Sequence, residues 1–219
     1  MTLQQTRDDS TTRRRISVTI NGREAAGEVD TRLTLADWLR DELDLVSVHL
    51  GCEHGVCGCC TVLLNGQSVR ACLLLAVQVD GQSVETVESL SSNPQELHPI
   101  QEAFHEEHGL QCGFCTPAMV LRTKEILEEK LDRTNEEVRH EISGILCRCT
   151  GYQNIVNSVQ CAARKLRGDA PSQHGDGIAP AAEVGAFEGQ GGEDPAPAPI
   201  GTGDDLTSHP RSENEEARA

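Results

Sequence analysis

Cysteine is the residue type that carries the most distinctive chemistry in this sequence. Three of the ten cysteines, Cys52, Cys57 and Cys60, are spaced C-x4-C-x2-C, and Cys72 follows them beyond a short stretch with a turn pattern. Four thiolates at this spacing can hold a [2Fe–2S] cluster, which accepts and releases single electrons. The spacing therefore predicts an iron–sulfur site in the first half of the chain.

Glycines separate these cysteines along the chain. Gly51, Gly55 and Gly58 alternate with the first three of them. Glycine tolerates positive φ angles and lets the backbone approach a ligand closely. Backbone N–H groups can then point at the anionic sulfurs of a cluster. We expect a tight loop that surrounds the metal centre.

A second set of cysteines lies further along the chain. Cys112 and Cys115 form a C-x2-C pair, and Cys147 and Cys149 form a C-x-C pair. Each pair directly precedes the predicted start of a helix, where free N–H groups and the helix dipole stabilise thiolates and anionic clusters. Two helix ends that meet head-on would create a second site with four sulfurs.

Zinc is the alternative metal for both sets. It accepts four thiolates, and a C-x2-C pair together with a C-x-C pair would suit a structural zinc site. The C-x4-C-x2-C loop with interleaved glycines is instead typical of [2Fe–2S] binding. We therefore favour iron–sulfur clusters at both sites.

Other residues near these motifs have simpler interpretations. The C-x2-C spacing favours Cys60 over the adjacent Cys59 as a ligand, so we expect Cys59 to be a small buried residue or a site prone to oxidation. Cys161 falls off the apolar stripe of its helix and is expected to be a spare thiol, and His54 is expected to be a loop residue. Arg148 either balances the charge of a cluster or is an ordinary surface residue.

Composition excludes several classes of partner. The formal net charge of -16 argues against nucleic acids and anionic membranes, which require a basic surface. No apolar run approaches the roughly 18 residues of a membrane span. The arginine run at residues 13–15 leads into a strand pattern rather than an apolar leader segment. We expect a cytoplasmic protein whose thiolates bind metal instead of forming disulfides.

The first half of the chain has the pattern of a small sheet. Residues 16–20 alternate apolar and polar, Asn21-Gly22 supplies a hairpin turn, and the chain returns through residues 23–29. Thr34 can cap a helix with one apolar face, formed by Leu35, Trp38, Leu39 and Leu43, with Trp38 in the core.

A second hairpin pattern follows the cysteine loop. Residues 61–64 and 68–71 flank Asn65-Gly66, residues 73–79 are apolar enough to be buried, and residues 83–87 alternate as a further strand. This order predicts a β-grasp ferredoxin-like domain at residues 15–91, preceded by a disordered arm at residues 1–14.

The pattern then changes to helices. We expect helices at residues 99–108, at 116–130 with Thr116 as the N-cap, and at about 134–143 with a capping box of Thr134 and Glu137. A fourth has an apolar stripe formed by Ile155, Val156, Val159, Ala162, Ala163 and Leu166. The fold class is therefore α+β, with a four-helix domain at residues 92–168. The acidic tail at residues 169–219 is rich in glycine, proline and alanine and is expected to be disordered.

Three motifs in register carry a resemblance to a known family. Residues 51–58, 111–117 and 147–152 resemble the iron–sulfur, or small, subunit of molybdenum hydroxylases such as xanthine dehydrogenase, aldehyde oxidoreductase and carbon monoxide dehydrogenase. The resemblance covers residues 16–166. All eight ligand positions of the family are filled, by Cys52, Cys57, Cys60, Cys72, Cys112, Cys115, Cys147 and Cys149.

The resemblance implies a place in a larger complex. In this family the helical-domain cluster lies next to the molybdopterin of a large subunit, and the ferredoxin-like cluster lies toward an FAD-binding medium subunit. Gln111 and Cys149 match positions that contact the pterin, whereas Ala118 stands where the family usually has glycine. The chain would relay electrons, without a catalytic residue or substrate site of its own, in a dimer of heterotrimers. The alternative is a free-standing two-cluster carrier, which would not need the helical domain.

Overall fold

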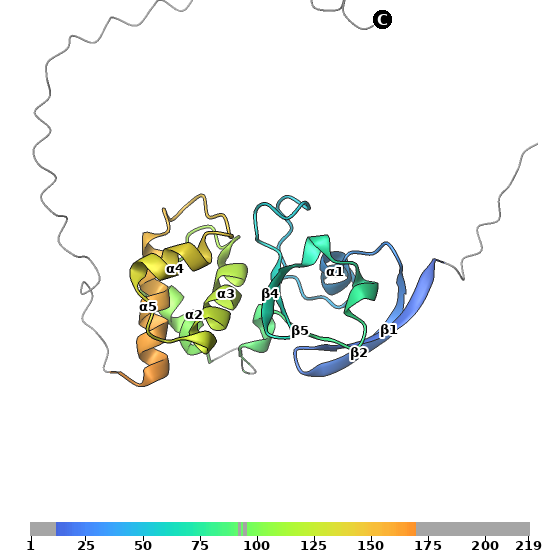
Figure 1. Cartoon of the computed structure of the whole chain (residues 1–219), viewed down its shortest axis with the longest axis horizontal. Helices are drawn as coiled ribbons and strands as arrows, with labels where there is room; N and C mark the ends of the chain where they lie inside the picture. The colour runs from blue at the N-terminus through green and yellow to red at the C-terminus, as the bar shows by residue number, and fades with distance from the viewer. Residues whose placement is uncertain (1–11, 92, 94–95, 170–219) are drawn as a thin grey trace, which may run out of the picture. The chain divides into compact units, whose positions relative to one another are not determined.

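The computed structural model describes residues 12–91, 93 and 96–169. All described residues belong to one compact unit. Within that unit, the strands lie in residues 13–85, with one short α-helix among them, and the longer helices lie in residues 99–167 (Figure 1). Residues 1–11 of the predicted arm and residues 170–219 of the predicted tail lie outside the described residues, and residues 13–14 are strand.

Five strands form one mixed sheet with the order β2-β1-β5-β3-β4. The antiparallel pairs are β1 with β2, β3 with β4, and β3 with β5, whereas β1 and β5 are parallel. The strands are β1 (Arg13–Ile20), β2 (Arg23–Asp30), β3 (Thr61–Leu64), β4 (Gln67–Arg70) and β5 (Ser83–Glu85). The mixed α and β architecture expected from the sequence is confirmed.

Both Asn-Gly turns are present as predicted. Asn21 and Asn65 have φ angles of 51° and 50°, and the glycines that follow them have φ angles of 76° and 83°. Asparagine and glycine tolerate this left-handed conformation, which matches the twist of a two-residue hairpin. The two turns fix the register of β1 with β2 and of β3 with β4.

The predicted helix after β2 is present but irregular. Thr34 caps it as expected, because its hydroxyl accepts the Asp37 N–H at 3.1 Å. In this segment, α1 (Leu35–Asp37) is a regular α-helix. Trp38–Glu42 form a π-helical turn, in which the Leu43 N–H donates to the Trp38 carbonyl at 3.2 Å. Trp38 is buried, as predicted.

Three short 3-10 turns lie between the end of β4 and residue 90. They are η3 (Ala71–Leu73), η4 (Ala76–Val79) and η5 (Val87–Ser89). The prediction that residues 73–79 are buried is wrong for Leu73, which is 59% exposed, although Ala76 and Val79 are buried. The Leu73 side chain lies against Gly55 of the cysteine loop instead of in the sheet core.

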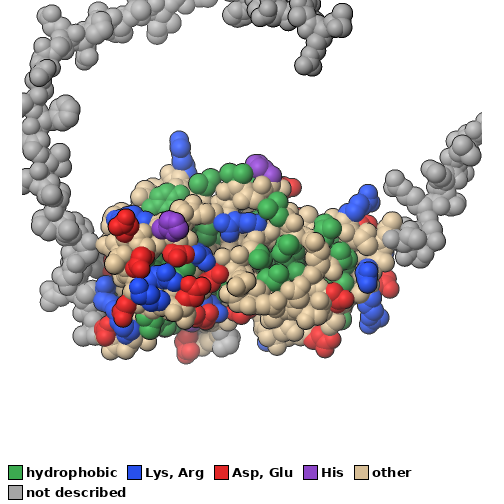
Figure 2. Space-filling model, in the orientation of Figure 1, with side chains coloured by type: hydrophobic (Ala, Val, Ile, Leu, Met, Phe, Trp, Pro, Cys, Tyr) green, Lys and Arg blue, Asp and Glu red, His purple; other side chains and the backbone are tan. Residues whose placement is uncertain are grey.

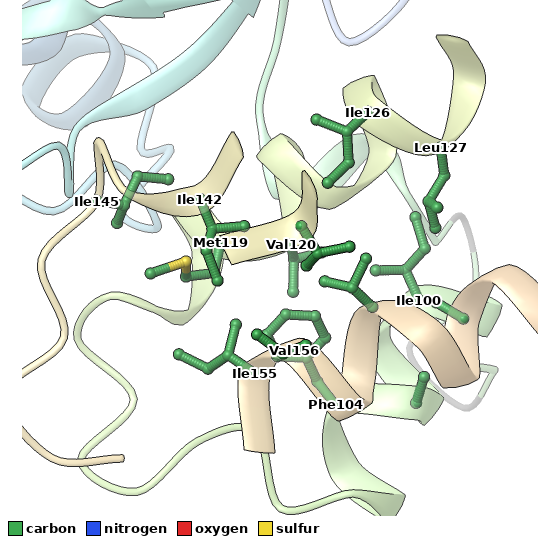
Figure 3. Packing of buried hydrophobic residues seen from close by; sticks show 14 of the residues in the cluster. Ile100, Phe104, Met119, Val120, Ile126, Leu127, Ile142, Ile145, Ile155 and Val156 are labelled. Atoms are coloured by element: carbon green, nitrogen blue, oxygen red, sulfur yellow. The ribbon is translucent and has the colours of Figure 1, made fainter. Parts of the chain in front are cut away.

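The second half of the described chain is helical. The helices are α2 (Pro99–Glu106), α3 (Thr116–Glu129), α4 (Asn135–Ile142) and α5 (Gln153–Arg167). Figure 3 shows Phe104, Val120, Ile155 and Val156 directed toward one another from α2, α3 and α5. Acidic and basic side chains are intermixed on the outside of the helices (Figure 2). In the part of the chain that the structure describes, no helix combines the length and apolar character needed to cross a bilayer.

The helix ends test two capping predictions. The Thr134 capping box is confirmed, because the Thr134 hydroxyl accepts the Glu137 N–H at 3.2 Å and the Glu137 carboxylate accepts the Thr134 N–H at 2.6 Å. Thr116 as an N-cap is wrong. The chain already has helical angles at Cys115, which is the N-cap, so Thr116 is the first helical residue. Its buried hydroxyl has no hydrogen-bond partner among the described residues.

Buried side chains form two hydrophobic clusters. The sheet cluster contains Val18, Leu39 and Val62, and the helix cluster contains Ile100, Met119 and their neighbours. Two residues depart from the predicted apolar stripe of α5, and the expectation that Cys161 is a spare thiol stays a prediction. Cys161 is buried, with 8% exposure, because α2 packs across this part of α5 and places Glu106 beside its thiol. Leu166 is 41% exposed because it lies in the last turn of the helix.

Candidate functional site

The first cysteine set is built by a loop and the end of a hairpin. Gly55 and Gly58 have φ angles of 83° and 74°, so the loop curls as the interleaved glycines predict. Cys72 lies in η3 directly after β4, and the Ala71 N–H donates to the Cys60 carbonyl at 3.2 Å. The hairpin therefore returns Cys72 to the loop.

Backbone hydrogen bonds and burial shift the pKa values of the thiols of this set in different directions. The Cys57 N–H lies 3.4 Å from the Cys52 sulfur, and hydrogen bonds with the backbone of Cys57 and His54 lower the pKa of Cys52 to about 6. Burial raises the pKa of Cys60 to about 11, with the Cys72 thiol beside it. The imidazole of His54 contacts the Cys52 carbonyl oxygen. A metal must deprotonate the buried thiols on binding, as is usual for thiolate ligands.

The adjacent thiols of Cys59 and Cys60 belong to different environments. Cys60 lies in the sheet cluster with Cys72, whereas Cys59 is 4% exposed and lies in the helix cluster with Cys115. Burial, followed by the charge of Cys57, raises the pKa of Cys59 to about 12. Cys59 is thus the small buried residue expected from the sequence, and Cys60 is the residue that lies beside Cys72.

The second cysteine set lies at the start of α3 and before α5. Cys115 is the N-cap of α3 and is buried, whereas Cys112 and Cys149 are exposed. The Cys147 sulfur lies 3.1 Å from the Thr150 hydroxyl, and the Cys147 N–H donates to the Tyr152 hydroxyl at 2.8 Å. Polar groups before α5 therefore contact Cys147, whereas Cys115 makes no side-chain capping bond at the start of α3, so the predicted contacts of helix N–H groups with the sulfurs stay a prediction.

Local hydrogen bonds and burial also shift the pKa values of the thiols of the second set in different directions. A hydrogen bond with the Phe114 backbone lowers the pKa of Cys112, and contact with Cys112 raises the pKa of Cys149. Burial alone would raise the pKa of Cys147, but hydrogen bonds with Thr150 outweigh it and lower the pKa. Burial, followed by contact with Cys147, raises the pKa of Cys115 to about 12.

Several of these thiols lie beside one another. Neighbours within a set are Cys52 with Cys57, Cys60 with Cys72, Cys112 with Cys149, and Cys115 with Cys147, and Cys57 also lies beside Cys59. No three His, Cys, Asp or Glu side chains within residues 12–91, 93 and 96–169 are grouped as ligands of a single metal ion. A [2Fe–2S] cluster takes two protein ligands at each iron. Each set of four cysteines has the number of donors that one such cluster needs.

Direct contacts connect the two cysteine sets. The Leu146 N–H donates to the Cys57 carbonyl at 2.8 Å, so a residue next to Cys147 is bonded to a residue of the first set. His49 stacks on Phe114 with ring centroids 4.8 Å apart, and a ring nitrogen of His49 lies 2.7 Å from the Phe114 carbonyl. Sequence reasoning missed these contacts because no local motif marks them.

The remaining residues singled out in the sequence lie at the surface, apart from Ala118. Gln111 is exposed next to Cys112, and Arg148 is exposed between Cys147 and Cys149. Ala118 is buried in the first turns of α3. Roles for Gln111 and Arg148 toward a cofactor or cluster stay predictions.

The fold and its two sets of four cysteines fit a protein with two iron–sulfur binding regions. Comparison with known families agrees. Residues 18–92 match the family described as "2Fe-2S iron-sulfur cluster binding domain", and residues 86–160 match the family described as "[2Fe-2S] binding domain".

Several known proteins are similar over the described region. The gamma subunit of caffeine dehydrogenase from Pseudomonas sp. strain CBB1 is 51% identical over 66% of this chain and 88% of that subunit. The small subunit of nicotine 6-hydroxylase from Paenarthrobacter nicotinovorans is 51% identical over 74% of this chain and 92% of that subunit. The crystal structure of quinoline 2-oxidoreductase from Pseudomonas putida 86 contains a chain that is 44% identical. The match covers 73% of this chain and 99% of that one, with a TM-score of 0.68.

This chain belongs to the family of small iron–sulfur subunits of molybdenum-hydroxylase-type dehydrogenases. It is an electron-transfer subunit of a multi-subunit oxidoreductase.

Proposed function

We propose that this chain relays electrons from a molybdopterin-binding large subunit to an FAD-binding medium subunit. Its two [2Fe–2S] clusters, when bound, each accept and release one electron. Cys52, Cys57, Cys60 and Cys72 would hold one cluster, and Cys112, Cys115, Cys147 and Cys149 would hold the other. The observations that support this proposal most directly are the two matched iron–sulfur families and the Leu146–Cys57 hydrogen bond that connects the two cysteine sets.

The second set has a side that a partner can approach. Cys112 and Cys149 are exposed, and the exposed Gln111 lies next to Cys112 in sequence. Apolar side chains that are also exposed, Leu110 and Phe114, flank the same segment. Because exposed apolar residues often mark protein interfaces, this arrangement supports contact of Gln111 and Cys149 with the pterin of the large subunit.

The first set has its own exposed apolar rim. Val56 in the cysteine loop is 62% exposed, and Leu73, which follows Cys72, packs its side chain against Gly55. A partner that covered these side chains would lie close to the first cluster. This supports docking of the FAD-binding medium subunit at the loop.

The proposal extends to domain organisation and assembly. We place a ferredoxin-like domain at residues 15–91 and a four-helix domain at residues 92–168, in line with the two hydrophobic clusters and the helices α2 to α5. We further propose a dimer of heterotrimers in the cytoplasm. The described cysteines form no disulfides, which fits a reducing compartment.

Copurification tests the proposal. A tagged chain expressed with its natural neighbours should bring down a molybdenum polypeptide and a flavin polypeptide at fixed stoichiometry. The chain itself should contain about four irons, two for each cluster. Caffeine, nicotine and an aldehyde would serve as trial substrates for the complex. A monomer that elutes alone with full redox competence would instead support the free-standing carrier.

A further inference from the structure

The Arg70 side chain forms hydrogen bonds with both halves of the described chain. It is the last residue of β4, two residues before Cys72. One guanidinium nitrogen donates to the Thr61 hydroxyl at 2.7 Å, and the other terminal nitrogen donates to the Gly144 carbonyl at 2.7 Å. No carboxylate among the described residues forms an ion pair with Arg70. Its guanidinium therefore bonds two neutral oxygens.

The first of these bonds holds the cysteine loop. Thr61 directly follows Cys60, and its hydroxyl donates to the Gly58 carbonyl at 2.6 Å, in a buried position. The Thr61 N–H also donates to the Gly58 carbonyl, at 3.2 Å. Arg70 thereby supports the part of the loop between Cys57 and Cys60 through the Thr61 hydroxyl.

The second bond holds the segment that leads to the other cysteine set. Gly144 lies three residues before Cys147, and the intervening Leu146 donates its N–H to the Cys57 carbonyl at 2.8 Å. A Cβ atom on Gly58 would lie 2.3 Å from the Gly144 carbonyl oxygen, so the two backbones are in direct contact. The Arg70–Gly144 bond and the Leu146–Cys57 bond therefore both hold residues 144–146 against the first half of the chain.

We infer that Arg70 is a positioning residue for electron transfer between the two clusters, an inference that rests on the proposed function. Arg70 fixes Gly144 against the cysteine loop and thereby preserves the Leu146–Cys57 bond. This bond is the short connection between the sites, because Cys57 belongs to the first set and Leu146 directly precedes Cys147 of the second. One electron leaves the reduced cluster and enters the oxidised one, and no bond forms or breaks. A lysine presents a compact ammonium rather than a fork, so it cannot reproduce both bonds in the same geometry.

Arg70→Gln is a suitable test because the variant should fold. A cavity of about 390 Å³ lies beside Arg70 and Gly144. Water that enters it can bond the Gly144 carbonyl after the guanidinium is removed, which avoids an unsatisfied acceptor. Arg32→Gln is the matched control, since Arg32 is exposed and pairs only with Asp30 among the described residues.

The experiment uses the whole copurified complex with each variant. Rapid-freeze electron paramagnetic resonance after mixing with substrate follows the appearance of each reduced cluster. We expect Arg70→Gln to slow passage from the first-reduced cluster to the second several-fold, because loss of the Gly144 bond loosens the Leu146–Cys57 contact between the two sites. Arg70→Lys should restore only part of the rate, and Arg32→Gln should match the wild type. An unchanged rate in Arg70→Gln would overturn the inference.

Two further readouts separate the inference from the proposed function. In the fully reduced complex, the magnetic interaction between the two clusters should weaken in Arg70→Gln. Hydrogen exchange at the Leu146 amide should become faster, even in protein without clusters. If wild-type complex shows two clusters but Arg70→Gln changes neither readout, only the role of Arg70 fails. If wild-type complex lacks two clusters, the proposed function fails first.

Discussion

Gly58 and Gly144 lie in backbone contact, because a Cβ atom at Gly58 would come within 2.3 Å of the Gly144 carbonyl oxygen. Gly58 also has a φ angle of 74°, a conformation that side chains rarely adopt. The contact brings the loop of the first cysteine set against the segment that leads to Cys147. Changes at Gly58 should therefore affect both cysteine sets.

We expect Gly58→Ala to destabilise the protein and to reduce iron bound at both sites. The positive φ angle alone should cost about 1–3 kcal/mol, and the clash with Gly144 should add to this. Gly66→Ala is the matched control, because Gly66 has a φ angle of 83° but a Cβ atom there would meet no described atom within 4 Å. Unfolding midpoints and iron analysis of the two variants provide the measurement. Equal losses in both variants would contradict the role of the contact.

Cys59 and Cys60 should respond differently to removal of their thiols. Cys59 packs in the helix cluster, so Cys59→Ala should keep about four irons per chain and lose about 1 kcal/mol of stability from the small cavity. Cys60 lies beside Cys72, so Cys60→Ala should lose the first cluster and keep about two irons. Iron analysis of both variants decides which of the two cysteines is the ligand. Loss of iron in Cys59→Ala alone would reverse the ligand assignment.

Glu125 on α3 should make stability depend on pH. Burial alone would raise its pKa, but hydrogen bonds from Ser68 and Arg122 and the charge of Arg122 lower it below its ordinary value of 4.5. The Ser68 N–H donates to the carboxylate at 2.9 Å, and Arg122 donates to it at 2.5 Å. Because the pKa is lower in the folded state, Glu125 stabilises the fold above pH 4.5 and loses this contribution as the pH falls through the folded pKa.

Glu125→Gln should therefore flatten the fall in stability on acidification. Urea unfolding at a series of pH values from neutral to below 4.5 measures the slope of the free energy of unfolding against pH. The variant should also be less stable than the wild type near neutral pH, because the amide cannot replace the charged bonds. Equal slopes in the two proteins would show that the Ser68 and Arg122 contacts do not favour the charged carboxylate.

Thr116→Val should stabilise the protein slightly. The Thr116 hydroxyl is buried without a partner among the described residues, and an unpaired buried hydroxyl costs about 1 kcal/mol or more. Thr123→Val is the control, because the Thr123 hydroxyl donates to the Met119 carbonyl at 2.8 Å and its loss should not stabilise. Denaturation of both variants gives the comparison. A destabilised Thr116→Val variant would mean that the hydroxyl has a partner in solution.

Local signals in the sequence predicted local structure well. The Asn21-Gly22 and Asn65-Gly66 turns and the Thr134 capping box depend on residues only a few positions apart, so the sequence contains all of their determinants. The spacing of the cysteine loop is local in the same sense, and its glycines Gly55 and Gly58 adopt the expected positive φ angles.

Burial on helix faces was harder to predict. Cys161 is buried because α2 contributes Glu106 over a face that the apolar stripe of α5 does not mark. Leu166 continues the stripe in sequence but lies in the last turn of α5, where it remains exposed. Periodicity identifies a helix, whereas the position of its neighbours decides which residues are covered.

The contacts between the two cysteine sets could not be predicted from the sequence. Arg70 and Gly144 are 74 positions apart, and the hydrogen bond between them depends on how the sheet and helices pack. A basic residue two positions before Cys72 was the one available signal, and an arginine at such a position has many ordinary roles. Long-range packing therefore determines the connection between the sites.

Electron paramagnetic resonance of the dithionite-reduced complex, combined with iron and zinc analysis, tests the central claim most directly. Two distinct [2Fe–2S] signals and about four irons per chain are the predicted result. A single signal, no signal, or stoichiometric zinc in place of iron would contradict the assignment of eight cysteines to two clusters.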